Sequence, residues 1–179
     1  IITSEKDFSA GFAKFFSWTV QGLEADDAAN LIGSITPQAV GLSKRALAKL
    51  TARLDGVPLA LRLIAPLLGP PLRLSPRKLM RSLNQAQKRM VALRGAHSPN
   101  TAVDVAVEIA YDFLAEELRP HYVALAVFSA PFTLAAAAAV WHVSTEKARD
   151  LLDRLVLLSL VEHQPGTETY EIHHLGRVH

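Results

Sequence analysis

The residues best suited to chemistry in this sequence are its histidines and serines. His163, His173 and His174 lie near the C-terminus, but two of them are adjacent and the chain has no cysteine, which is poor for the tetrahedral ligand set of zinc. Ser129 and Ser159 lack the Gly-x-Ser-x-Gly setting of an exposed nucleophile. We therefore expect no metal ligands and no catalytic residues here.

The stretch LDGVPLALRLIAPLL, residues 54–68, combines helical spacing of apolar residues with two helix-breaking residues. Gly56 suits the left-handed position that ends a helix, and Pro58, after Val57, suits the first position of the next helix. Such a corner exposes the unpaired amides of the second helix, which attract anions. The alternative interpretation is an ordinary turn between two helices of a bundle, which needs no ligand.

Glycines, prolines and capping residues mark the elements that must position this corner. They predict strands at 1–3 and 16–20, a helix that begins near Glu24 and ends at Gly33, a helix over 42–54, a helix from Pro58 that is kinked or ended early by Pro66, a linker at 69–71, and a long helix opened by Ser75 and Pro76.

The part of the chain after residue 100 has a different pattern. It predicts a helix capped by Asn100-Thr101, helices over 121–128 and 134–142, and a helix capped by Ser144 that buries Ala148, Leu151, Leu152, Leu155 and Leu158. A β-hairpin is expected around Pro165-Gly166. Three helices followed by a hairpin is the order of a winged helix-turn-helix.

Composition narrows the class of protein further. The 179 residues are 50% hydrophobic, which is enough for one large or two small domains, and a net charge of +2 gives no strong reason to expect a nucleic-acid or membrane partner. The absence of cysteine suits a reducing cytoplasm, where we place the protein. Residues 123–143 carry no charge and could span a bilayer, but Pro131 breaks them, so we expect two short buried helices there.

Taken in order, these segments resemble the NB-ARC module of the signal-transduction ATPases with numerous domains (STAND). LDGVPLALRLIAPLL is similar to the family's GLPLA segment, and IITSE is similar to the strand of the first nucleotide sensor. The stretch over 107–141 resembles the linker and opening helices of the family's winged-helix part. LLDRLVLLSLVEHQPGTETYEIHHLGR resembles its last helix, its wing and the segment of the Met-His-Asp motif.

The resemblance implies a mainly α fold: a small helical bundle plus a winged helix-turn-helix, preceded by the last strands and helix of a truncated α/β P-loop NTPase domain. It divides the chain into 1–36, the end of the nucleotide-binding domain, 37–100, a helical domain, and 101–179, the winged helix. It implies that Pro58, with Gly56 and Val57, lies beside the adenine of ADP or ATP. His173 takes the place of the histidine that contacts the phosphates.

The sequence departs from the family at three of these positions. Ile172 and His174 replace the methionine and aspartate of the motif, and Glu5 stands where the sensor arginine is usual. A carboxylate cannot stabilise a γ-phosphate. The phosphate-binding loop and the Mg²⁺-organising aspartate are absent from these residues, so we expect them upstream of Ile1 in a longer polypeptide.

The expected function is therefore that of a nucleotide-dependent switch, in which the helical and winged-helix domains close over ADP and control activation. Its partners would be adenine nucleotide, an upstream NTPase domain, a downstream sensor domain and, on activation, further copies of the protein. The parent would be at most a weak ATPase.

The alternatives are a DNA-binding winged-helix regulator and a helical scaffold for protein partners. The charges of residues 145–159 cancel, and the hairpin carries Glu168 and Glu171 but no basic residue, so we expect no DNA binding by the winged helix.

Overall fold

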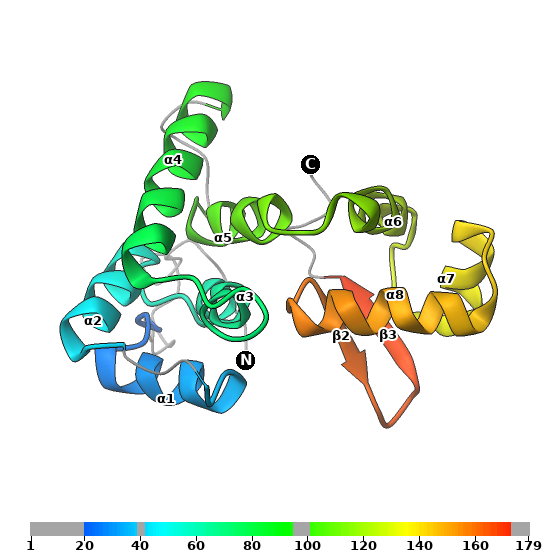
Figure 1. Ribbon diagram of the computed structural model, residues 1–179, viewed down its shortest axis with the longest axis horizontal. Helices are drawn as coiled ribbons and strands as arrows, with labels where there is room; N and C mark the ends of the chain where they lie inside the picture. The colour runs from blue at the N-terminus through cyan, green and yellow to red at the C-terminus, as the bar shows by residue number, and fades with distance from the viewer. Residues whose placement is uncertain (1–19, 39–41, 95–100, 173–179) are drawn as a thin grey trace, which may run out of the picture.

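The computed structural model describes residues 20–38, 42–94 and 101–172. These residues form a mainly helical fold with one small antiparallel sheet (Figure 1). The α-helices are α1 (Ala25–Ile35), α2 (Lys44–Arg53), α3 (Pro58–Leu68), α4 (Pro76–Arg94), α5 (Thr101–Asp112), α6 (Arg119–Ala124), α7 (Leu134–Trp141) and α8 (Thr145–Leu157). Two 3₁₀ turns, η2 (Glu116–Leu118) and η3 (Leu125–Val127), flank α6, and the strands are β1 (Phe132–Thr133), β2 (Val161–Gln164) and β3 (Thr169–Ile172).

Several predicted features lie outside the described residues. These are the strand at 1–3, most of the strand at 16–20, Glu5, the cap at Asn100, His173 and His174.

Two predicted helix starts are confirmed, and α2 begins two residues later than predicted, after a cap at Ser43 that was not predicted. The Ser43 hydroxyl accepts a hydrogen bond from the Ala46 amide at 3.2 Å, and α2 begins at the next residue. The helix start predicted at Ser75 is confirmed, because its hydroxyl accepts from the Lys78 amide at 3.3 Å and Pro76 is the first residue of α4. The Ser144 cap of α8 is also confirmed, with the Lys147 amide 3.2 Å from the hydroxyl.

The helix end predicted at Gly33 is wrong. Gly33 does not end α1, which runs to Ile35, because an exposed glycine inside a helix costs only about 1 kcal/mol relative to alanine. Thr36 is the C-cap, and its hydroxyl donates a hydrogen bond to the Ala65 carbonyl of α3 at 3.1 Å.

Pro66 lies inside α3, and the helix continues through it to Leu68. Pro66 is buried, and only Leu67 and Leu68 follow it in the helix. The predicted early end at Pro66 is therefore wrong, and whether the helix is kinked there stays a prediction; proline removes one backbone hydrogen bond, and we attribute the continued helix to the burial of this turn.

The sheet is built around β3. Strand β2 pairs with it in the register His163↔Tyr170, which confirms the hairpin predicted around Pro165 and Gly166. Strand β1, which the sequence did not predict, pairs with the other edge of β3 in the register Phe132↔Tyr170, giving the antiparallel order β1-β3-β2. The helix predicted over 121–128 is shorter than expected, because α6 ends at Ala124 and tightens into η3.

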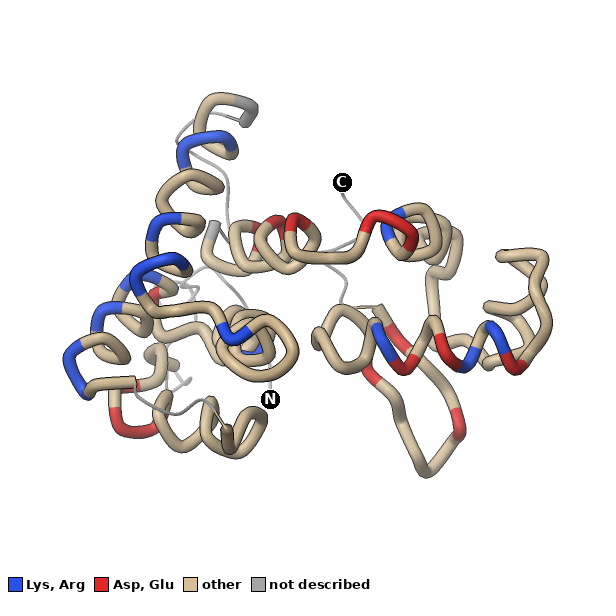
Figure 2. The backbone as a smooth tube through the Cα atoms, viewed as in Figure 1, with Lys and Arg blue, Asp and Glu red and all other residues tan. Residues whose placement is uncertain are grey.

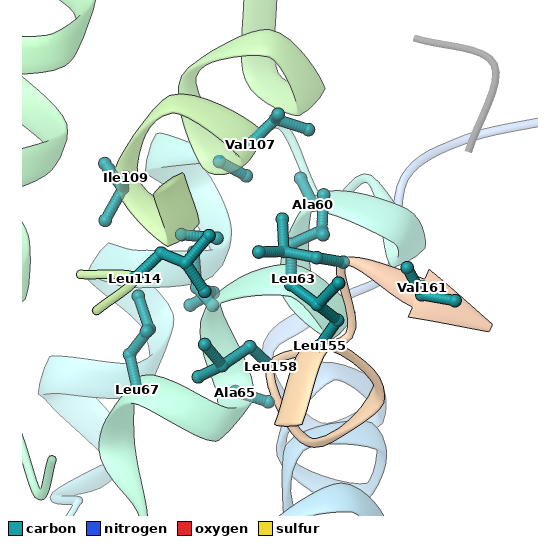
Figure 3. Packing of buried hydrophobic residues seen from close by; sticks show 14 of the residues in the cluster. Ala60, Leu63, Ala65, Leu67, Val107, Ile109, Leu114, Leu155, Leu158 and Val161 are labelled. Carbon is teal, nitrogen blue, oxygen red and sulfur yellow. The ribbon is translucent and has the colours of Figure 1, made fainter. Parts of the chain in front are cut away.

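Helix α3 is at the centre of the core. It contacts α1 and α5, while α5 also packs against α4. Figure 3 shows Leu155, Leu158 and Val161, from the region of α8 and β2, gathered with Ala60 and Leu63 of α3. The helical part and the sheet part therefore share one hydrophobic core. No helix among the described residues is long and apolar enough to cross a membrane.

Candidate functional site

The corner between α2 and α3 is formed by two consecutive residues in the left-handed conformation. Asp55 has φ 52° and Gly56 has φ 62°. The Gly56 amide donates to the Thr51 carbonyl at 2.9 Å and the Asp55 amide donates to Ala52 at 3.3 Å, which is the bonding pattern of a Schellman motif. The helix stop predicted at Gly56 is therefore present, but Asp55 occupies its first left-handed position.

Gly56 is also a point of backbone contact with the segment before α1. The Leu23 amide donates to the Gly56 carbonyl at 2.8 Å. A Cβ on Gly56 would lie 2.5 Å from the Leu23 oxygen, and one on Gly22 would lie 2.1 Å from the Asp55 oxygen. Both glycines are therefore required for this crossing, which fixes residues 22 and 23 against the corner.

The first turn of α3 has no side-chain cap. Val57 occupies the N-cap position with an extended backbone, and its apolar side chain accepts no hydrogen bond. Pro58 is the first helical residue and is exposed, as the sequence predicts. The corner thus presents a proline ring next to the amide end of a helix, where backbone N–H groups have no partner within the helix.

One cavity adjoins the corner on the side of α4 and α5. It has a volume of about 90 Å³ and is lined by Arg53, Asp55, Leu83, Gln87, Ala102 and Val105. Small-molecule sites usually enclose about 300–1,000 Å³, so this cavity is too small for a nucleotide. A nucleotide at the corner would need further walls from another part of the protein.

Strand β2 approaches the same face of α3 from the sheet. Arg62 lies one helical turn after Pro58, and its Nη2 is 3.2 Å from Glu162 Oε1 on β2. Val161 pairs in register with Ile172, the residue before His173. His173 itself lies outside the described residues, which end with Ile172 on β3, the strand that pairs with β2.

Of the other candidate groups, His163 and Ser159 lie among the described residues. His163 stacks on Tyr170 with ring centroids 4.7 Å apart, and its Nε2 lies 3.6 Å from Glu168 Oε2. Ser159 lies in the turn between α8 and β2 with φ 55°. Within 20–38, 42–94 and 101–172, no three histidine, aspartate or glutamate side chains are grouped to hold a metal ion.

Sequence reasoning missed Gly22, Asp55 and Arg62. Arg62 could have been found, because it lies four residues after Pro58 and so on the same helical face. The contact of Gly22 with the corner had no local signal, since it joins segments more than thirty residues apart.

The comparisons with known proteins add no assignment: no family model matches the chain, and no curated protein is significantly similar to it.

Proposed function

We propose that this chain is the regulatory part of an ADP/ATP-dependent switch of the NB-ARC type. The observation that supports the proposal is the corner at 54–58, where the exposed Pro58 is the first residue of α3 and the helix has no side-chain cap. Gly56 fixes the backbone of this corner, because a Cβ there would clash with Leu23. A proline ring offers an apolar surface to an adenine. The amides at a helix start favour an anion or an acceptor edge of the base.

We further propose that residues 119–172 form the winged helix of this module. The supporting observation is the order α6, β1, α7, α8, β2, β3 with the sheet order β1-β3-β2. In this interpretation α8 is the third helix and the β2–β3 hairpin is the wing. The last strand then leads into His173, whose imidazole can donate to a phosphate oxygen.

In this division of labour the chain binds and senses the nucleotide but does not hydrolyse it. A phosphate-binding loop and its Mg²⁺ would come from the domain that completes the site. The 179-residue chain alone should release no phosphate from ATP above a heat-treated control. Submicromolar binding of ADP by this chain alone would contradict this assignment of roles, because the residues that bind the phosphates most strongly would then lie within the chain.

The decisive experiment measures ADP binding by the longer polypeptide in which a phosphate-binding domain precedes this chain. Pro58→Ala should weaken ADP binding several-fold, and His173→Ala should weaken it about tenfold to a hundredfold, the worth of one charge-assisted hydrogen bond. The matched control is Pro76→Ala, since Pro76 is also the first residue of a helix. If Pro58→Ala and Pro76→Ala retain ADP equally well, the corner is only a helix–helix turn.

The rival function, groove reading by the winged helix, has weaker support. Two of the three basic residues of α8 are in ion pairs: Lys147 Nζ lies 3.4 Å from Asp150 Oδ2, and Arg154 Nη2 lies 2.6 Å from Glu117 Oε1. The hydrogen bond from Arg154 lowers the pKa of Glu117, so this carboxylate stays charged. DNA binding driven by phosphate neutralisation needs unpaired basic side chains, and α8 has few to offer.

A further inference from the structure

The charges of this chain are strongly segregated along the sequence. Residues 42–94 contain twelve lysines and arginines and a single carboxylate, Asp55, which is a net charge of +11. The remaining residues carry seven basic and sixteen acidic side chains, a net charge of −9. Figure 2 shows the basic positions along α2 and α4, and the acidic ones mainly on α5, α8 and the hairpin. The small net charge of the whole chain conceals this separation.

Two regular rows of basic residues follow from the helical spacing. On α2, Arg45, Lys49 and Arg53 recur every four residues. On α4, Arg77, Arg81 and Lys88 recur at intervals of four and seven, which keeps them on one face. The core residues of α4 lie two positions further along and so point to the opposite side: Leu79, Leu83, Ala86 and Met90.

The two rows meet in space. Helices α2 and α4 are in contact, and Arg53 Nε donates to Asn84 Oδ1 at 3.1 Å. Asn84 lies on α4 between Arg81 and Lys88, on the same face. We call the combined surface of Arg45, Lys49, Arg53, Arg77, Arg81 and Lys88 the α2–α4 basic face.

Few of the positive charges on the basic face are balanced by carboxylates of the described residues. All of its six side chains except Arg53, which is half-buried, belong to exposed residues. Among the described residues none of the six is in an ion pair. In contrast Arg62 pairs with Glu162, and Arg89 pairs with Glu108 and Asp112. We therefore exclude these two arginines from the face, because their charges are already balanced.

We propose that the α2–α4 basic face binds the phosphate backbone of duplex nucleic acid. At a rise of 1.5 Å per residue, Arg77 and Lys88 are about 16 Å apart along α4, and a duplex presents about one phosphate charge per 1.7 Å over that length. Helices α2 and α4 contain no aromatic residue. Single-strand binding relies on aromatic stacking, so the duplex is the better fit.

Two other polyanions fit this face less well. A helix that lies on a membrane needs large apolar side chains beside its basic ones, and over 44–53 and 76–92 only Val91 is a large, exposed apolar residue. A second copy of this chain would have to offer an acidic row. Its carboxylates are scattered over several elements, and Glu108, Asp112, Glu117, Asp150 and Glu162 are paired with basic residues of their own chain.

The experiment is a fluorescence anisotropy titration of the 179-residue chain against labelled duplex DNA and duplex RNA of equal length, at several salt concentrations. Contacts from six basic residues predict that log K falls with log[salt] at a slope of about −5. Removing two contacts with Arg77→Gln and Arg81→Gln together should weaken binding at least about tenfold in low salt and make the slope shallower by about 2. Arg45→Gln with Lys49→Gln should have a similar effect.

The control variant changes Lys147→Gln and Arg149→Gln together, which removes the same charge from the exposed side of α8. It should bind as the unmodified chain does. Circular dichroism checks that every variant is folded. The proposal is overturned if neither duplex binds in 50 mM salt, or if the control loses as much affinity as the α4 variant. It is also overturned if phosphatidylserine vesicles or polyglutamate bind as tightly as the duplexes, or if light scattering shows that low salt only drives self-association.

Discussion

The substitution Gly56→Ala tests how the α2–α3 corner is held. At φ 62° an alanine would have a strained backbone, which costs roughly 1–2 kcal/mol. Its Cβ would lie 2.5 Å from the Leu23 oxygen and 2.6 Å from the Leu23 nitrogen, two backbone atoms that cannot rotate away. The segment before α1 must then move, which breaks the hydrogen bond from Leu23 to Gly56 at a further cost of about 1 kcal/mol.

We therefore expect Gly56→Ala to reduce the free energy of unfolding by about 3 kcal/mol. With a urea m-value of about 2 kcal/mol/M, the unfolding midpoint should fall by about 1.5 M. The matched control is Gly33→Ala, because Gly33 lies inside α1 and a Cβ there meets nothing within 4 Å. This control should raise the stability by up to about 1 kcal/mol.

The double variant Gly22→Ala with Gly56→Ala should be much less destabilised than the sum of the two single variants, since both remove the same contact. If Gly56→Ala unfolds within 1 kcal/mol of the unmodified chain, the crossing of residues 22 and 23 over the corner does not constrain it, and the reasoning fails.

Three further outcomes follow from the packing. Leu155→Ala should reduce the free energy of unfolding by about 2–5 kcal/mol, because Leu155 is fully buried. The matched control Leu157→Ala, on the exposed side of α8, should change it by less than about 0.5 kcal/mol. Equal losses of the two variants in urea unfolding would contradict the shared core. Burial raises the pKa of Tyr122 to about 12, so the stability tied to its neutral hydroxyl is complete below pH 10 and is lost as the pH rises to 12, by about 3 kcal/mol. Tyr122→Phe should lack this part of the alkaline loss, and identical pH profiles of the two proteins would refute it. In the Arg62–Glu162 ion pair the two side chains are 42% and 40% exposed. A double-mutant cycle should therefore give a coupling free energy below about 1 kcal/mol that becomes weaker with added salt. A larger coupling would show that the ion pair is effectively buried.

The sequence predicted best those features that are set by local chemistry. Ser75 with Pro76, Ser144, and the Gly56–Pro58 stop and start were recognisable because capping and turn residues act on their immediate neighbours. The prediction that Pro66 ends α3 early was wrong, because α3 continues to Leu68 and Pro66 is buried in the core. Strand β1 escaped notice because two residues carry no periodicity, and only their pairing with β3 defines them.

The candidate site was only partly predictable for the same reason. The corner and the exposed Pro58 follow from spacing, but the crossing by Gly22 and Leu23 depends on a contact between distant segments. The domain boundaries at 36/37 and 100/101 and the role of His173 stay predictions. The α2–α4 basic face was hidden by summing charge over the whole chain. A charge count in windows of about fifty residues would have revealed it.

The core that α3 shares with α8 and β2 determines how much free energy any switch built from this chain would need in order to open. Swinging the sheet part away from α3 would expose Leu63, Leu155 and Val161, each at most 1% accessible in this structure. At about 1.5–3 kcal/mol for each side chain, opening would cost about 5–9 kcal/mol, so fewer than about one molecule in a thousand would be open at rest. Coupling free energies between two binding sites are typically about 1–3 kcal/mol, which is less than this cost. An activating partner would therefore have to cover the leucine surface of α3 as the sheet part leaves it.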